Sequence, residues 1–239
     1  MKILSSLLLA ALAAIPAYAT PFAFQPNPTD LNDLSHNSAY TWGISGANES
    51  TLKSQLASGY QITNVTLTIT NIYNWDAADT TNQLFIHLLD NPLNNVTTII
   101  DDPANNGVNQ GTVSDYFSGN ISSNHGVYYS GTNTYLTQYH DPNGPITTTN
   151  LSYDLTSFAS TFASYIGNGH TGGSGYADFG LGFDPDCHYY NDGITLTITT
   201  SNSVPDNAVT LLLLGVGLVA VAGLHRRWPS RVPAPRCGN

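Results

Sequence analysis

The central part of this sequence has almost no basic residues. All 16 acidic residues lie between Asp30 and Asp206, and Lys53 is the one basic residue in that region, so its net charge is −15. A nucleic acid is bound through clustered Lys and Arg side chains that release its counterions, and an acidic polysaccharide needs the same charges or bridging metal ions. The composition therefore excludes nucleic acids as partners and disfavours acidic polysaccharides.

Glutamate is also scarce, because Glu49 is the one glutamate and every other acidic residue is an aspartate. Aspartate, asparagine and glycine favour turns and loops, since the two polar side chains bond to nearby backbone groups and glycine adopts positive φ angles. The acidic composition is therefore typical of loops rather than of helices.

The N-terminus has the layout of a cleaved secretory signal. Lys2 precedes an apolar run over residues 3–15, and the small residues of Ala17-Tyr18-Ala19 form a cleavage site. The apolar run is too short for a membrane-spanning helix. We predict a signal peptide over residues 1–19, export of the protein, and a mature chain that begins near Thr20.

A second apolar segment lies near the C-terminus. Residues 208–224 carry no charge, and His225-Arg226-Arg227 follow at once. The segment is just long enough to cross the hydrocarbon core of a membrane, and the basic residues favour a cytoplasmic location for its end. We predict a single transmembrane helix over residues 208–224 in the inner membrane and a cytoplasmic tail over residues 228–239.

The segment 204–227 resembles a known class of sorting signal. Val204-Pro205-Asp206, the apolar helix and Arg226-Arg227 follow one another behind an export signal, as in the VPD variant of the bacterial PEP-CTERM class. The resemblance implies that a membrane-embedded exosortase reads the tripeptide, cuts nearby and passes the protein to the cell surface or extracellular matrix. The usual signal ends at the basic cluster, whereas this chain continues through residues 228–239.

Cysteine provides no disulfide framework. Cys187 and Cys237 are the two cysteines, and they lie on opposite sides of the predicted transmembrane helix, so they cannot pair within one chain. The exported region between the two ends is long enough to bury a single core without such crosslinks.

Alternation of apolar and polar residues predicts an all-β exported domain over residues 20–203. In residues 61–75, apolar side chains lie on one side of the strand and polar ones on the other. We place Tyr73 and Trp75 on the apolar side with Val65 and Leu67, and Asn74 on the polar side. Further strands are predicted over residues 38–44, 84–89, 94–100, 126–139 and 150–155, after a polar leader over residues 21–33.

One short helix interrupts this pattern. After Thr156, residues Phe158, Phe162 and Tyr165 recur at helical spacing until Gly167 ends the run. Short strands, many turns and one helix predict an antiparallel β-sandwich of the jelly-roll type. The central position of His87 in an apolar strand predicts a structural role for its side chain.

The body also resembles a domain that recurs in other exosortase-sorted exported proteins. The strings that carry this resemblance are HNSAYTWGI, NIYNW, FIHLLDN and FGLGFDPDCHYYNDGITLTI, within residues 35–200. It implies an exported β-sandwich and supplies no mechanism.

The last predicted strands flank an acidic loop, and we predict that they form an antiparallel hairpin within residues 176–200. The loop offers hard oxygen ligands that suit calcium; the candidate ligands are Asp184, Asp186, Asn191 and Asp192. The spacing is not that of an EF-hand, because His188 stands at the fifth position and Thr195 stands where a bidentate Glu is required. A turn capped by its own Asx hydrogen bonds is the alternative.

Cys187 and His188 allow sharper hypotheses. A zinc site would use the thiolate, and a catalytic thiol would need a distant histidine. The candidates for that histidine are His36, His87, His125, His140 and His170. A structural zinc site normally has four ligands, and adjacent residues of an extended chain point to opposite faces. The third hypothesis, which we favour, is a small buried thiol.

Two functions remain open. The favoured one is a non-catalytic surface module that binds a neutral glycan or exopolysaccharide through tyrosines, which supply contact area and a hydroxyl group. The candidate contact residues are Tyr128, Tyr129, Tyr189 and Tyr190. The alternative is a secreted, calcium-dependent carbohydrate-active enzyme that uses aspartate carboxylates. A deep pocket with converging carboxylates of raised pKa would favour the enzyme.

Overall fold

The structure is a computed structural model that describes residues 19–75, 82–100, 115–118, 128–140, 148–169, 173–202 and 215. One compact unit comprises Ala19–Asn202, and the other comprises Met1–Tyr18 and Ser203–Asn239. The predicted signal peptide, sorting motif and transmembrane helix lie outside the described residues, apart from Ala19 and Gly215. Among the helices that are described, none has the length and apolar character needed to cross a membrane.

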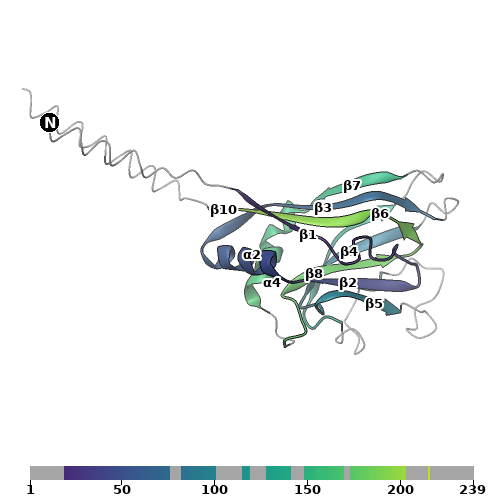
Figure 1. Ribbon diagram of the computed structural model, residues 1–239, viewed down its shortest axis with the longest axis horizontal. Helices are drawn as coiled ribbons and strands as arrows, with labels where there is room; N and C mark the ends of the chain where they lie inside the picture. Colours follow the sequence, from purple (N-terminus) through teal and green to yellow (C-terminus); the bar gives the residue numbers. More distant parts are fainter. Residues whose placement is uncertain are drawn as a thin grey trace, which may run out of the picture. The chain divides into compact units, whose positions relative to one another are not determined.

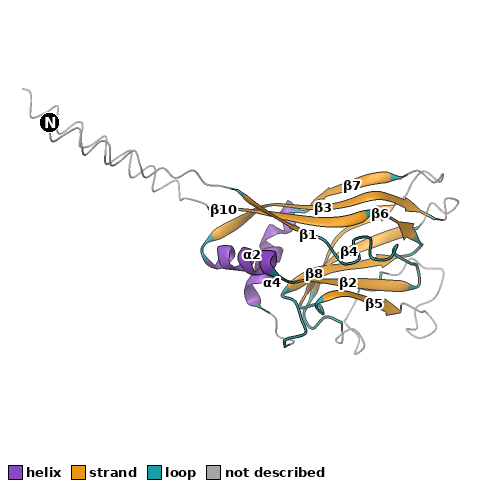
Figure 2. Ribbon diagram, in the orientation of Figure 1, coloured by secondary structure: helices purple, strands orange, loops and turns teal. Residues whose placement is uncertain are grey.

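Two antiparallel sheets of five strands pack as a β-sandwich, which confirms the predicted all-β class (Figures 1 and 2). The first sheet contains β1 (Thr20–Phe24), β3 (Tyr60–Asn74), β7 (Thr149–Asp154), β9 (Tyr189–Tyr190) and β10 (Gly193–Asn202). The second contains β2 (Ser38–Ile44), β4 (Gln83–Asp90), β5 (Asn95–Ile100), β6 (Asn133–His140) and β8 (Phe179–Pro185). The strand orders are β1-β10-β3-β7, with β9 paired to β3, and β5-β2-β8-β4-β6.

The core lies between the two sheets. On β3, Val65, Leu67 and Ile69 are fully buried, and each lies opposite an apolar residue of β10. Complete burial of such a side chain contributes about 1.5–3 kcal/mol relative to its exposed state. The alternation that predicts this strand therefore identifies its core-facing side as far as Ile69.

Beyond Ile69 the buried side of β3 changes. The pairing of β3 with β7 shifts between Ile69 and Ile72, and Asn71 adopts a left-handed conformation with φ 49°. One extra residue in a strand reverses the alternation that follows it. The prediction was therefore wrong there: Asn74 is buried, whereas Tyr73 is half-buried and Trp75 is 63% exposed.

The predicted terminal hairpin is also wrong. β8 lies between β2 and β4 in the second sheet, whereas β10 lies between β1 and β3 in the first. The acidic segment between β8 and β10 connects the two sheets and contains β9, which pairs with β3. Alternation indicates which face of a strand is buried and does not specify its partner, so two consecutive strands can belong to different layers.

Two helices lie together at one end of the sandwich (Figure 2). A helical segment is present after Thr156 as predicted: a 3-10 turn (Thr156–Phe158) leads into α4 (Ala159–Asn168), which buries Phe162 and Ile166. The helix α2 (Ala47–Ala57) was not predicted. The sequence of α2 has no apolar stripe that would indicate a helix, and Leu52 is its one buried residue.

The predicted polar leader contains β1. This strand pairs with β10 along its whole length and buries Phe22 and Phe24. Pro21 occupies a position on this edge strand, where a missing N–H is tolerated. The strand has five residues, and its two phenylalanines flank Ala23, which gave too little alternation to predict the strand.

Candidate functional site

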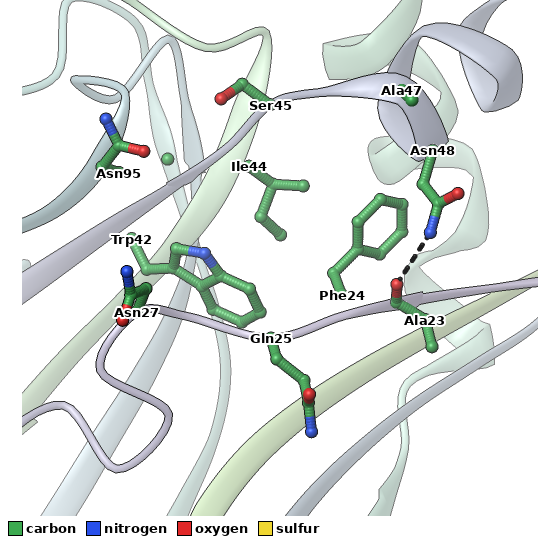
Figure 3. Close-up of a pocket in the computed structure, with 11 residues that line it drawn as sticks. Ala23, Phe24, Gln25, Asn27, Trp42, Ile44, Ser45, Ala47, Asn48 and Asn95 are labelled. Carbon is green, nitrogen blue, oxygen red and sulfur yellow. Dashed lines mark hydrogen bonds between the residues drawn. The ribbon is translucent and has the colours of Figure 1, made fainter.

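A pocket of about 510 Å³ lies between the two sheets, beside the start of α2 (Figure 3). Its walls come from the end of β1, the end of β2, the first residues of α2 and the first residue of β5. Since β1 and β5 are edge strands of different sheets, the pocket lies along one side of the sandwich.

Apolar side chains form the floor of the pocket. Figure 3 shows the indole of Trp42 and the ring of Phe24 on opposite sides of it, with Ile44 between them. All three are core residues, with exposed fractions of 3%, 7% and 2%. Phe24 is held by an edge contact with Phe179, whose ring centroid is 6.1 Å away. The floor is therefore a rigid aromatic surface that is fixed by the core.

Four exposed amide side chains surround this floor. They are Gln25, Asn27, Asn48 and Asn95. The amide nitrogen of Gln25 donates to Thr195 Oγ1 at 3.0 Å, and that of Asn48 donates to the carbonyl oxygen of Ala23 at 3.1 Å. Each side-chain amide has two N–H donors and a carbonyl acceptor. After these bonds, each retains groups that can bind hydroxyls of a ligand.

The backbone supplies further polar groups. The N-cap residue of α2 is Gly46, with φ 115°, and no side chain caps the first N–H groups of this helix. Ser45 and Ala47, on either side of Gly46, line the pocket. The first N–H groups of a helix have no intrahelical acceptor and therefore suit a ligand oxygen.

Gly43 allows the other wall of the pocket to come close. A Cβ atom at Gly43 would lie 2.0 Å from the carbonyl oxygen of Leu93, so a larger residue would push this segment away. Because Asn95 follows in the same segment, the glycine determines how closely the amide of Asn95 approaches the pocket.

The described residues that line the pocket include no ionisable side chain. The nearest charged group along α2 contains Glu49 and Lys53, and Lys53 pairs with the buried carboxylate of Asp178. Burial and a hydrogen bond with Asp178 raise the pKa of Glu49. Burial also raises the pKa of Asp90, and the negative charge of Asp178 raises it further. These carboxylates interact with one another outside the pocket lining.

The carboxylates of Asp184 and Asp192, two of the predicted calcium ligands, accept hydrogen bonds from protein groups. The carboxylate of Asp184 is buried and accepts from the backbone N–H of Tyr116 at 2.6 Å. The carboxylate of Asp192 is exposed and accepts from Asn71 Nδ2 at 2.5 Å. Asp186 is half-buried.

Asn191 forms the turn bond that the alternative interpretation expects. Its Oδ1 accepts from the N–H of Gly193 at 3.1 Å, and its Nδ2 donates to the carbonyl oxygen of Asp30 at 2.9 Å. Within the described ranges, no group of three or more His, Cys, Asp or Glu side chains is placed to hold a metal ion. Calcium binding by this loop remains a prediction.

The predicted tyrosines have different locations. Tyr129 and Tyr189 are buried, with exposed fractions of 1% and 0%. Tyr128 is half-buried against a small cluster that contains Tyr129. Tyr190 is half-buried and stacks on Tyr73 at a centroid distance of 4.9 Å. Tyr190 is therefore the one of the four that stands on an outward-facing strand position.

Cys187 and His87 are structural residues. The Cys187 side chain is 8% exposed and belongs to the main core, whereas His188 next to it is half-buried on the other side of the chain. His87 is buried, with Nε2 2.8 Å from Asp115 Oδ2 and Nδ1 3.2 Å from Asn133 Oδ1. Both of its ring nitrogens are used within the protein, as predicted for a structural histidine.

Comparisons with known proteins do not identify a family. The sequence matches no family model and no curated protein. Among solved structures, the chain is similar to one from Desmodium yellow mottle tymovirus, with 12% identity, a TM-score of 0.24 and coverage of 79% of this chain and 87% of that chain.

Proposed function

We propose that this protein is an exported module that exosortase sorts to the cell surface or extracellular matrix, and that it binds a neutral glycan without catalysis. The carrying observation is the pocket, which combines an aromatic floor with a rim of amides and contains no ionisable side chain among its described lining. The sorting part of the proposal rests on the resemblance of residues 204–227 to the VPD-type signals.

The chemistry of the pocket matches that of a sugar ring. A pyranose has apolar C–H faces and a perimeter of hydroxyl groups that both donate and accept hydrogen bonds. The small exposed parts of Trp42 and Phe24 can contact the apolar C–H groups, and amides such as Asn48 can pair with the hydroxyls. The net charge of −15 between Asp30 and Asp206 repels polyanions, so the ligand is a neutral glycan or exopolysaccharide.

A second candidate function is a secreted carbohydrate-active enzyme that uses carboxylates, with calcium as cofactor. The observation in its favour is the raised pKa of Glu49 beside the buried Asp178, since a carboxyl group that keeps its proton can act as a general acid. The pocket lining lacks these groups, so the binding module is the better supported function.

The test is a screen of the full chain against neutral and acidic polysaccharides, with and without calcium, in a detergent that has no sugar head group. Binding and release of reducing ends are both measured. We expect binding of a neutral glycan, no product, and about 10-fold weaker binding in Asn48→Ala/Asn95→Ala, because two hydrogen bonds are lost. Asn168→Ala, an exposed asparagine on α4, is the matched control and should bind like the unmodified protein.

Two outcomes would contradict glycan binding in this pocket without catalysis. Product release that is lost in Glu49→Gln would establish the enzyme instead of the binding module. Equal affinity of the double variant and the Asn168→Ala control would show that the glycan binds elsewhere.

A further inference from the structure

The end of β3 and the short strand β9 form a two-stranded ribbon. Tyr73 lies opposite Tyr190, and Asn74 lies opposite Tyr189. The backbone N–H of Trp75 donates to the carbonyl oxygen of His188 at 2.9 Å, which extends the pairing by one residue. Cross-strand neighbours on one face of such a ribbon are close enough for their side chains to interact.

The two faces of this ribbon differ completely. Successive residues of a strand point to opposite sides, so Asn74 and Tyr189 share one face. Both are buried, and the ring of Tyr189 packs against Tyr139 at a centroid distance of 5.8 Å. This inward face belongs to the protein core.

The outward face carries an aromatic ring at every position. These positions are Tyr73, Trp75, His188 and Tyr190, here called the aromatic face. Tyr73 and Tyr190 stack at 4.9 Å with an interplanar angle of 24°, and His188 lies 4.6 Å from Tyr190. Trp75 is 63% exposed, which is far more than the other tryptophan of the sandwich, Trp42.

The aromatic face is not needed to cover the core, because the opposite side of the same ribbon does that. Exposed aromatic surface is unfavourable in water, and contiguous patches of it mark binding surfaces. The bulge at Asn71 determines the orientation of these side chains, because it turns Tyr73 and Trp75 away from the core. The structure therefore turns outward Tyr73 and Trp75, which sequence alternation alone assigned to the interior.

We propose that the aromatic face is a second binding surface, on which pyranose rings of a neutral polysaccharide stack. This proposal rests on the proposed function and extends it from one pocket to two separate contacts. Flat rings such as Trp75 and Tyr190 pack against the C–H face of a sugar, and the tyrosine hydroxyls can bond to its hydroxyl groups.

Charge selects a neutral ligand for the aromatic face. In the sequence of the connecting segment, the ionisable side chains next to the aromatic face are the carboxyl groups of Asp186 and Asp192. Among the described residues, Lys53 is the one lysine or arginine, and it pairs with Asp178 beside α2. A polyanion would be repelled, and so would a second copy of a domain with this net charge.

The two contacts lie apart on the sandwich. Phe24 of the pocket lies opposite Leu196, and Leu196 lies opposite Leu67 of β3, so Tyr73 stands six residues, or about 20 Å, further along that strand. The pocket is beside α2, so each contact needs its own reporter. Trp42 and Trp75 provide one in each place, and Trp228 in the tail is the third tryptophan of the chain.

The experiment uses the full chain in two single-tryptophan forms, in a detergent without a sugar head group. Trp42→Phe/Trp228→Phe leaves Trp75, and Trp75→Phe/Trp228→Phe leaves Trp42. Both are titrated with cellohexaose, laminarihexaose and mannohexaose while tryptophan emission is recorded. We expect at least one hexasaccharide to change the emission of Trp75 in a saturable way.

A variant series identifies the surface. Tyr190→Ala in the Trp75 form should weaken the response about 3- to 10-fold, which is the contribution of one aromatic contact. Tyr135→Ala is the matched control, because Tyr135 is 45% exposed on β6, in the other sheet, and should leave the response unchanged.

The outcomes separate the two proposals. A response of Trp42 with a silent Trp75 would overturn the second surface and leave the pocket in place. A response of Trp75 with a silent Trp42 would support the second surface and contradict the pocket. Self-association that Tyr190→Ala abolishes, with no response of Trp75 to any hexasaccharide, would show that the aromatic face binds a second copy and would overturn the proposal.

Discussion

Replacement of Trp42 by alanine tests whether the pocket floor is also part of the core. Trp42 lies in the middle of β2, opposite Val96 of β5 and Leu181 of β8, and is 3% exposed. Removal of a buried aromatic side chain costs about 3–5 kcal/mol, from lost burial and from the cavity that remains. For a domain of this size, we expect the melting temperature to fall by about 6–20 °C.

The assay is urea unfolding of Trp42→Ala and Trp42→Phe, followed by circular dichroism. Phenylalanine keeps one aromatic ring on the floor, so it should retain most of the free energy of unfolding and most of the glycan affinity. Alanine should lose both. A loss of less than about 1 kcal/mol in Trp42→Ala would refute the reasoning, because it is typical of a surface position rather than of a buried ring.

Three further predictions concern charge, sorting and calcium. The pKa of Glu49 is raised by burial and by its hydrogen bond with Asp178, so the folded state binds this proton more tightly than the unfolded state. The free energy of unfolding should therefore fall as the pH rises from about 4.5 through the folded pKa. Glu49→Gln should remove this loss in unfolding experiments across that range. Replacement of Val204-Pro205-Asp206 should keep the protein in the inner membrane, as measured by cell fractionation, and normal surface delivery would contradict the sorting proposal. Calcium at 100 times its Kd should add about 2.7 kcal/mol to the free energy of unfolding and raise the melting temperature by several degrees. Asp184→Asn/Asp186→Asn should abolish that rise. An unchanged melting temperature in the unmodified protein would mean that the segment is only a turn.

Sequence patterning predicted the faces of the strands better than their partners. The alternation in β3 identifies Val65 to Ile69 as core residues because burial on one face leaves a period of two. The same pattern failed after Asn71, since a bulge is a local backbone event with no periodic signal of its own. Sheet membership of β8 and β10 depends on packing between distant segments and could not be obtained from alternation.

The candidate site was less accessible to sequence reasoning than the fold. The scarcity of basic residues leads to the expectation of a neutral ligand, but the pocket combines residues from β1, β2, α2 and β5 that are far apart in the chain. Two of these elements, β1 and α2, had too weak an apolar pattern to be predicted at all. Of the predicted contact tyrosines, Tyr190 faces outward because β9 pairs with β3 and buries Tyr189 instead.

The most direct test of glycan binding in the pocket is an amide NMR spectrum of the full chain during titration with the best-binding neutral oligosaccharide from the screen. The account predicts that the side-chain NH₂ signals of Gln25, Asn27, Asn48 and Asn95 shift together with one affinity, while that of the control Asn168 stays in place. Binding that leaves these four signals unchanged and shifts amides elsewhere would contradict it.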